Sequence, residues 1–429
     1  MISWQHQTVC FLCLVLQGAL TGEPYDFDAS AFEKKPYSLN GSIELRPSLA
    51  LLNRESESYK TQYGLDNEPR FLDTYLSRLE ISGDYRKGPF LFFASGLGFA
   101  QYERYSALLD YDAFPYEVYG KLGFEGKSTN VWLGKKTFKW GKGYAYNPTA
   151  FAARPKDIND VEANLEGYWS LSGEFIRSFS SRISTVALNV VIIPEYKEWN
   201  TGYIGQEGVS GAAQLYMLAF DTDVDFCFYS DNGQNPRLGI GFSRNIIPNL
   251  EVHGEAAYAF HHQVTSVTEQ YVLETVVNPV YNALLGARYL TKWNTTVIAE
   301  YIRNGQGLSK AQMDVYYSAL RNRAALSPDI RNFLNLNAGQ YMGQFAMRDY
   351  VYARISHPEP FGLLYLTPSA YAMANLRDAS LMTAFEIAYT RFKNTTLTGK
   401  MMVLQGGSQS EYGSKTKKTQ MELRGRFYF

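Results

Sequence analysis

The last eight residues of the chain, 422-ELRGRFYF-429, alternate between two kinds of side chain. Leucine, glycine and two phenylalanines occupy one set of alternate positions, and a glutamate, two arginines and a tyrosine occupy the other. Because successive side chains of a β-strand point to opposite faces, this alternation predicts a strand with one apolar and one largely charged face. A strand of about ten tilted residues with this pattern is typical of a closed barrel that crosses a membrane.

Segments with the same alternation recur toward the N-terminus, as far as Ser38. We count eighteen of them, an even number, as single-chain bacterial barrels have. Segments 129–139 and 211–220 alternate poorly, so sixteen or twenty strands remain open. The predicted strands span residues 38–52, 70–86, 89–104, 115–126, 129–139, 167–178, 181–193, 211–220, 222–231, 235–245, 249–261, 280–291, 294–304, 349–356, 363–376, 380–391, 394–405 and 420–429.

The connections between these segments alternate in length. Connections after even-numbered segments are short, and those after odd-numbered segments are long, with short exceptions near Asn232 and Arg377. The long ones span residues 53–69, 105–114, 140–166, 194–210, 262–279, 305–348 and 406–419. Membrane barrels have short periplasmic turns and longer external loops, whereas a soluble β-sandwich or propeller has no reason to keep this parity. The sequence therefore predicts an all-β, antiparallel, up-and-down transmembrane barrel over 38–429.

Composition excludes several other classes of protein. The 41 Lys and Arg residues balance 42 Asp and Glu residues, so no global field favours nucleic acid as a partner. Beyond the N-terminal region the chain has no apolar run of the length that a membrane-spanning helix needs. It also lacks a Gly-x-Ser-x-Gly elbow, a paired-histidine metal motif and a phosphate-binding glycine loop. We therefore expect no enzymatic activity, no cofactor and no bound metal.

The N-terminus carries a candidate export signal. Residues 9–20 form a short apolar run that is followed by small residues and then by polar sequence, as in a secretory signal peptide. The segment before this run contains no Lys or Arg, which departs from the usual signal. We predict a cleaved signal peptide over 1–22 and a periplasmic N-terminal segment over 23–37.

The aromatic C-terminus, with Phe427 and Phe429, resembles the last strand of outer-membrane proteins, whose final Phe is part of the signal read by the barrel assembly machinery. Together with the N-terminal signal and the loop parity, it makes the chain similar to bacterial outer-membrane β-barrels of the porin-like type. This resemblance implies location in the outer membrane of a Gram-negative-type cell. It also implies outer-membrane lipid, the assembly machinery and small solutes as partners, and leaves open a homo-oligomer or a periplasmic partner protein.

The connection 140–166 resembles, in position and length, the third external loop of porins, which folds into the barrel and narrows it. The resemblance implies a constriction set by six of its charged residues: Arg154, Lys156, Asp157, Asp160, Glu162 and Glu166. Its basic part, 139–156, and its acidic part, 157–166, could line opposite sides of the opening. The alternative is that these charges are solvated on an outward-facing loop. From the strand alternation we expect further pore-lining charges at Arg78, Glu80, Glu117, Lys121, Arg237, Arg288 and Arg354.

The longest connection, 305–348, is predicted to be partly helical. Ser309 and Gln312 have the spacing of a capping box, and Ser327 followed by Pro328 fits an N-cap with proline at the first helical position. We expect two short helices here, which either cover the mouth of the barrel or protect its rim.

These observations favour a pore that passes small hydrophilic solutes or a selected substrate. Two alternatives stay open: a barrel that sheathes a partner protein, as in porin–cytochrome electron conduits, and an exporter of a polysaccharide such as alginate. The sequence does not identify the solute or the ion selectivity.

Overall fold

The computed structural model describes residues 35–63, 69–124, 128–159, 165–196, 199–200, 207–232 and 235–429. The predicted signal peptide and most of the predicted periplasmic segment lie outside the described residues. The chain divides into two compact units, Met1–Tyr37 and Ser38–Phe429. The second unit holds the sheet and the helices described below.

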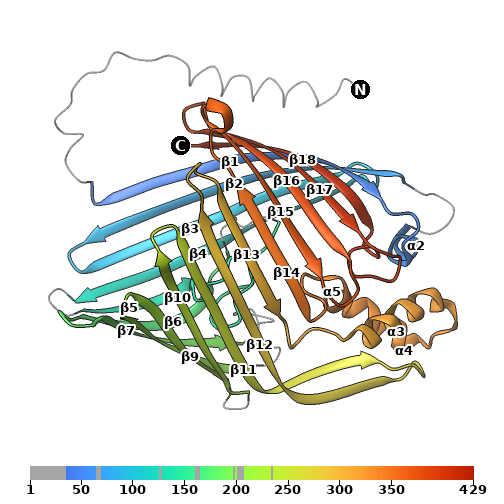
Figure 1. The fold of residues 1–429 in the computed structure, drawn as a ribbon, viewed down its shortest axis with the longest axis horizontal. Coiled ribbons are helices and arrows are strands. Elements are labelled where there is room, and N and C mark those ends of the chain that lie inside the picture. The colour runs from blue at the N-terminus through green and yellow to red at the C-terminus, as the bar shows by residue number, and fades with distance from the viewer. Residues whose placement is uncertain are drawn as a thin grey trace. The chain divides into compact units, whose positions relative to one another are not determined.

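The described part of the chain contains eighteen strands that form one sheet, in which sequence neighbours pair antiparallel (Figure 1). The predicted class and strand number are confirmed. The strands are β1 (Tyr37–Leu52), β2 (Phe71–Lys87), β3 (Phe90–Glu103), β4 (Leu108–Phe124), β5 (Thr129–Lys136), β6 (Tyr168–Ser178), β7 (Ile183–Glu195), β8 (Gly208–Ala219), β9 (Thr222–Asp231), β10 (Arg237–Ile247), β11 (Leu250–Val267), β12 (Leu273–Leu290), β13 (Thr296–Arg303), β14 (Asp349–Ser356), β15 (Leu366–Asn375), β16 (Leu381–Tyr389), β17 (Thr395–Gln405) and β18 (Lys417–Tyr428).

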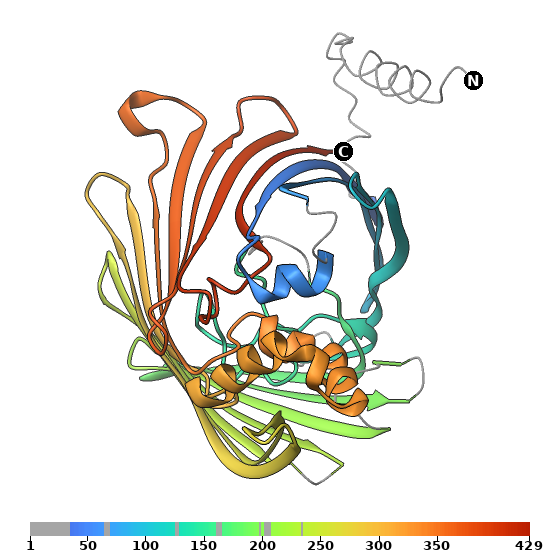
Figure 2. The same ribbon diagram turned by 90° about the vertical axis from the view of Figure 1, so that its right-hand side faces the viewer.

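The barrel closes between β1 and β18. Ile43 lies opposite Phe427 and Glu44 opposite Arg426 in this antiparallel pair. The last residue also takes part, because the backbone N–H of Phe429 donates to the carbonyl of Gly41 at 3.0 Å. The view along the barrel shows the closed ring of strands (Figure 2). Closure satisfies the backbone groups that an open sheet edge would expose.

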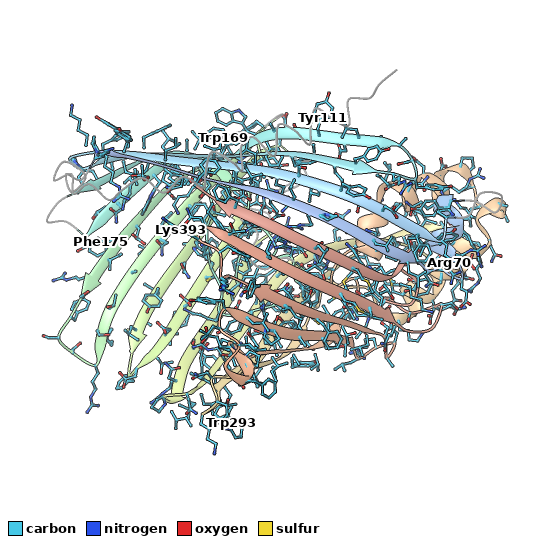
Figure 3. All side chains as sticks on the ribbon, turned by 90° about the horizontal axis from the view of Figure 1, so that it is seen from above. Arg70, Tyr111, Trp169, Phe175, Trp293 and Lys393 are labelled. Atoms are coloured by element: carbon cyan, nitrogen blue, oxygen red, sulfur yellow. The ribbon has the colours of Figure 1, made fainter. Side chains whose placement is uncertain are left out.

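The two faces of the barrel wall differ as the alternation predicts. On β18, Leu423 is 66% exposed, whereas on the neighbouring strand the carboxylate residue Glu44 is only 2% exposed. Tyr111 and Trp293 project from the outside of the wall (Figure 3). The outer surface is rich in exposed leucine, isoleucine, valine and aromatic side chains along most strands. An apolar outer face with a charged inner face is the pattern of a transmembrane barrel.

Two predicted long loops are instead mostly strand. β4 begins at Leu108, so most of the predicted loop 105–114 belongs to a hairpin with β3. Likewise β11 ends at Val267 and β12 begins at Leu273, which reduces the predicted loop 262–279 to a short turn. In β4 and β12 the added residues are exposed whichever way they point, so they carry no inward-outward alternation for a sequence pattern to detect.

The helices lie in the long connections. They are α2 (Glu57–Tyr63), α3 (Lys310–Arg321), α4 (Pro328–Leu336) and α5 (Ala338–Met342), with single 3-10 turns at η2 (Arg323–Ala325) and η3 (Pro360–Gly362). The predicted capping box of Ser309 and Gln312 begins α3, and Ser327 caps α4 with proline at its start. α2 and α5 were not predicted, because each is at most two turns long and lacks a capping box. Within the described residues, no helix has the length and apolar character needed to cross a membrane.

The segment 304–348 lies at the loop end of the barrel, where α2 and α3–α5 lie across the opening in the view along the barrel (Figure 2). The rings of Tyr316 and Tyr341 stack with centroids 4.2 Å apart. These buried helix residues share one apolar cluster with inward-facing wall residues such as Ile302, Tyr350 and Met373. The interior of the barrel at this end therefore holds a small hydrophobic core of its own.

Candidate functional site

Segment 140–166 is fastened to the inner wall by a glutamate of β11. Glu255 is 4% exposed, and its Oε1 accepts hydrogen bonds from the backbone N–H groups of Lys142 (2.5 Å) and Gly143 (2.8 Å). Its Oε2 accepts from the backbone N–H and the hydroxyl of Thr149, at 3.0 and 2.6 Å. Hydrogen bonds to an ionised group are among the stronger ones, so this carboxylate fixes the loop backbone in place.

A second glutamate, on β13, repeats the arrangement. Glu300 is 1% exposed and accepts from the backbone N–H groups of Tyr144 (2.6 Å) and Ala145 (2.9 Å). The ring Nε2 of buried His253 lies 3.0 Å from the same carboxylate. We refer to Glu255 and Glu300 together as the carboxylate clamp.

The clamp depends on glycine in the loop. A Cβ added to Gly143 would collide with the carbonyl oxygen of Tyr146 and approach Cδ1 of Leu284 to 2.7 Å. Gly141 has φ +96°, a conformation that other residues rarely adopt. The two glycines let the chain turn so that consecutive N–H groups face the wall.

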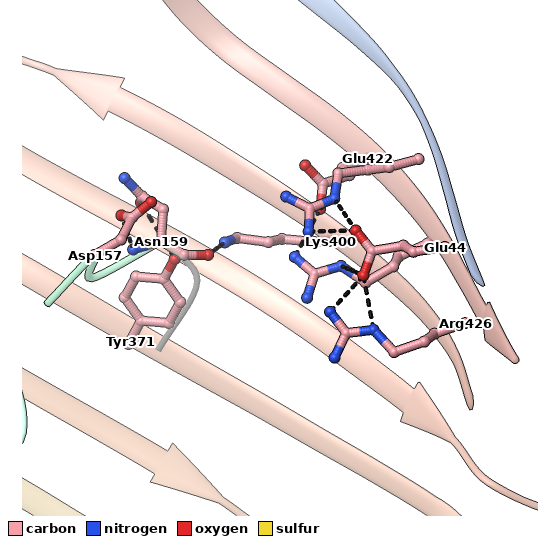
Figure 4. A network of polar contacts seen from close by, with 9 residues as sticks. Glu44, Asp157, Asn159, Tyr371, Lys400, Glu422 and Arg426 are labelled. Atoms are coloured by element: carbon pink, nitrogen blue, oxygen red, sulfur yellow. Dashed lines mark hydrogen bonds and ion pairs between the residues drawn. The ribbon is translucent and has the colours of Figure 1, made fainter. Parts of the chain in front are cut away.

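The far part of the segment reaches strands remote from its own. The backbone carbonyl of Asn159 accepts from Nζ of Lys400 on β17, and its side-chain oxygen accepts from the hydroxyl of Tyr371 on β15 at 3.4 Å (Figure 4). The segment follows β5 and precedes β6, which lie far from β15 and β17 in the sheet order. The part of this segment up to Asn159 therefore runs through the interior of the barrel and does not face outward.

Beside this contact lies a charged cluster at the barrel seam (Figure 4). Glu44 accepts from both Arg46 (2.6 Å) and Arg426 (2.5 Å). Arg424 pairs with Glu422 at 3.2 Å. These ion pairs join β1 and β18 at the seam, so they stabilise the closing pair of strands as well as lining the lumen.

The predicted constriction charges occupy different environments. Arg154 pairs with Glu166 at 3.1 Å, and Glu166 also contacts Lys135 of β5 at 2.5 Å. The expectation that the basic and acidic parts line opposite sides is therefore wrong for this pair, because Arg154 and Glu166 contact each other directly. Nζ of Lys156 donates to the carbonyl of Gly143 at 2.7 Å, and burial lowers the pKa of this lysine.

Asp157 links the segment to the helical connection. Its Oδ1 accepts from Nε2 of Gln344 at 2.6 Å and from the backbone N–H of Asn159 at 2.8 Å. Asp160 and Glu162, the other two predicted constriction residues, lie outside the described residues.

A cavity of about 1050 Å³ opens between the segment and the wall. Its lining combines backbone and side chains of 137–157 with residues of β2–β4, of β10–β12 and of the 304–348 connection. The charged lining residues are Glu117, Lys139, Arg154, Lys156, Asp157 and Arg237. Five of the predicted pore-lining residues therefore line this one cavity: Glu117, Arg154, Lys156, Asp157 and Arg237.

The remaining predicted wall charges lie on the inward face but do not line this cavity. On β2, Arg78 and Glu80 are partly buried, whereas the neighbouring Leu79 and Ile81 are more than 40% exposed. Nζ of Lys121 lies 5.2 Å from the ring centroid of Trp132. Arg288 pairs with Glu251 at 3.0 Å, and Arg354 lies opposite Tyr371 in the pairing of β14 with β15.

The strand alternation is compatible with an inward position for Glu255 and Glu300, but it gives these two residues no role. Their partners are backbone N–H groups more than a hundred residues away in sequence, which no motif reveals. The strand pairing gives one indication that these two glutamates bind something other than their neighbours in the sheet. Glu255 lies opposite Gly241 and Leu284, and Glu300 opposite Gly286 and Tyr352, so neither has a basic partner across the strands. Inward carboxylates without such a partner need another donor.

No protein-family model and no curated protein matches the chain. Solved structures of similar fold do match. OccK2 (OpdF) of Pseudomonas aeruginosa, in complex with glucuronate, is 10% identical, with 92% of this chain and 98% of that chain covered and a TM-score of 0.53. OccAB3 of Acinetobacter baumannii is also 10% identical, with 91% and 99% covered and a TM-score of 0.51. These similarities concern the fold.

Proposed function

We propose that this protein is an outer-membrane pore for small hydrophilic solutes, in which segment 140–166 sets the width of the passage. The observation that carries the proposal is the segment itself, which the carboxylate clamp holds inside the barrel beside the cavity. An eighteen-stranded barrel leaves an aqueous interior unless something fills it. A fixed internal segment narrows that interior and gives it a defined charge.

The charges around the cavity support a preference for anions. Four cationic residues, Lys139, Arg154, Lys156 and Arg237, line it against the two carboxylates of Glu117 and Asp157. Charged linings of this kind govern which ions enter a pore. A small carboxylate such as glucuronate, the ligand in the OccK2 structure, is a suitable probe of this preference.

The alternatives have no supporting observation. A sheath around a folded partner needs an empty interior, whereas this barrel holds its own segments 140–166 and 304–348. An exporter of a long polymer needs a continuous wide channel, which the same two segments would obstruct. The pore proposal carries with it export through a cleaved signal over 1–22 and recognition of Phe427 and Phe429 by the assembly machinery.

Single-channel recording of the purified protein in planar bilayers tests the proposal. Deletion of 149–159 removes the part of the segment that runs from the clamp contact of Thr149 to the far-wall contacts of Asn159, so conductance should rise. Uptake of glucuronate into proteoliposomes should exceed uptake of glucose, a neutral sugar of similar size. If neither the intact protein nor the deletion variant conducts ions, the proposed function is contradicted.

A further inference from the structure

Two arginines contact one aspartate at the end of the barrel that carries the long loops, and a third arginine lies next to it in the chain. Asp349 begins β14, and its Oδ2 lies 2.7 Å from NH1 of Arg303, the last residue of β13. Nε of Arg377, in the turn after β15, donates to the same oxygen. Arg348 directly precedes Asp349 in the chain, but its Nε donates to the backbone carbonyl of Gly307 at 3.0 Å.

This cluster belongs to the outer face of the wall. Along β13, Val297 and Tyr301 are exposed while Ile298 and Ile302 are buried toward the interior. Arg303 continues the exposed set because residues two apart share a face. Asp349 stands in the same relation to exposed Val351 on β14. The cluster is therefore separate from the lumen and from the proposed pore.

The cluster carries an excess of positive charge. Oδ1 of Asp349 accepts from the hydroxyl of Tyr301 at 2.9 Å, so both oxygens of the single carboxylate are already engaged. Burial, and then the nearby guanidinium groups of Arg303 and Arg377, lower the pKa of Arg348. Arg303 and Arg377 face the single carboxylate of Asp349, which leaves one positive charge of this cluster without a partner of opposite sign. An anion at this position would relieve their mutual repulsion.

The surroundings indicate what kind of anion fits. Tyr281, whose ring centroid lies 5.3 Å from Arg303, is 57% exposed on the outer face, and Tyr301 is 44% exposed. Toward the middle of the wall the outer face continues with exposed Leu285 and Val297. Tyrosines that border an apolar band mark the membrane–water interface of a barrel. A ligand at this place meets guanidinium groups on one side and apolar wall on the other.

We propose that Arg303 and Arg377 form a binding site for the phosphate headgroup of a membrane lipid. Guanidinium groups match the oxygens of a phosphate with paired N–H donors. A charged side chain on the lipid-facing surface is costly near the bilayer centre and tolerated near the interface, where a headgroup can neutralise it. The apolar wall below the cluster is positioned to receive the acyl chains of the same lipid.

Native mass spectrometry of the detergent-purified barrel tests this site with dioleoyl phosphatidic acid, dioleoyl phosphatidylcholine and inorganic phosphate as probes. Phosphatidic acid should bind more tightly than phosphatidylcholine. The double variant Arg303→Gln with Arg377→Gln should weaken phosphatidic acid binding about tenfold or more, as loss of charge-assisted hydrogen bonds does. Asp349→Asn removes the one neutralising charge and should strengthen binding, an effect that misfolding cannot produce.

Arg104→Gln is the matched control. Arg104 lies at the same end of the barrel, is exposed and contacts a single carboxylate, Asp73, at 3.5 Å. Its loss should leave lipid binding unchanged. Equal binding of the two lipids, or no response to the double variant, overturns the proposal. Binding of inorganic phosphate as tightly as phosphatidic acid also overturns it. The same holds if the double variant loses an oligomer while its lipid binding stays unchanged. Conductance in bilayers reports on the pore separately.

Discussion

Segment 140–166 enters the barrel and segment 304–348 lies across its loop end, and different forces hold the two in place. Segment 140–166 is irregular and is fastened through its backbone N–H groups to two buried glutamates, Glu255 and Glu300. Segment 304–348 is largely helical and is held by apolar side chains, among them Tyr316 and Tyr341. The first depends on a few directional contacts and the second on many non-directional ones.

This difference determines how each segment should respond to change. Hydrogen bonds to a carboxylate fix position to a few tenths of an ångström, which suits a segment that defines a passage. Apolar packing is spread over many residues and gives stability in proportion to the area buried. Loss of the clamp should therefore alter pore width, whereas loss of one packed ring should alter the stability of the helical segment.

The largest effect is expected from the clamp. In the double variant Glu255→Gln with Glu300→Gln, an amide N–H₂ replaces one oxygen of each carboxylate and meets loop N–H groups that need an acceptor. Each hydrogen bond to a charged group contributes about 1.5–3 kcal/mol, so the segment loses most of its attachment. Single-channel conductance should rise and fluctuate more than in the parent protein.

Glu251→Gln is the control for that experiment. Glu251 lies on β11, on the same face as Glu255, and pairs with Arg288 without a hydrogen bond to segment 140–166. It should leave conductance close to that of the parent. If the clamp variant conducts like the parent while remaining folded, the carboxylates do not position the segment.

A smaller effect is expected in the helical segment. Tyr316→Ala removes a buried ring that stacks on Tyr341, which should destabilise the docked segment by about 3–5 kcal/mol. Limited proteolysis of the folded barrel should then cleave within 304–348 faster than in the parent. Tyr316→Phe keeps the ring and should resist cleavage. Equal cleavage of all three proteins would show that packing at this position does not hold the segment.

The sequence predicted these two segments unequally. The alternation predicted the barrel and its strand number, because one face of each strand meets the lumen and the other the apolar exterior. The helices α3 and α4 were predicted because Ser309 and Ser327 form local caps, which depend on neighbouring residues alone. The clamp was not, because a glutamate that binds backbone N–H groups across the barrel leaves no local pattern. The pairing of Arg154 with Glu166 was missed for the same reason.

A third effect concerns pH and the connection 406–416, which braces the helical segment. Glu411 is buried and accepts from the hydroxyl of Tyr350 and the amide of Asn375, both at 2.6 Å. Burial raises the pKa of Glu411 above its ordinary value, although Tyr350, Lys415 and Asn375 act in the opposite direction. An acid with a raised pKa favours the folded state at low pH, and this contribution is lost as pH rises through the raised value.

Protection of 304–348 from an acid-tolerant protease should therefore decline modestly as the pH rises above about 4.5, the ordinary pKa of a glutamate. Glu411→Gln cannot titrate and should abolish the decline. A decline of equal size in the variant would assign the pH dependence to another group.

The smallest effect is expected where the two segments meet. Asp157 accepts a hydrogen bond from Gln344 and lines the cavity, so it joins the regions and also contributes to the lining charge. Asp157→Lys replaces a negative with a positive charge, and one such change at an effective dielectric constant near that of water alters the local energy of an ion by about 1 kcal/mol or less. The reversal potential under a potassium chloride gradient should shift toward chloride selectivity, with little change in conductance. Asp314→Lys is the control, because Asp314 is exposed on α3 and pairs with Lys310 away from the cavity lining. An equal shift in both variants would show that the field at the mouth sets ion preference, and Asp157 would then serve only to join the two segments.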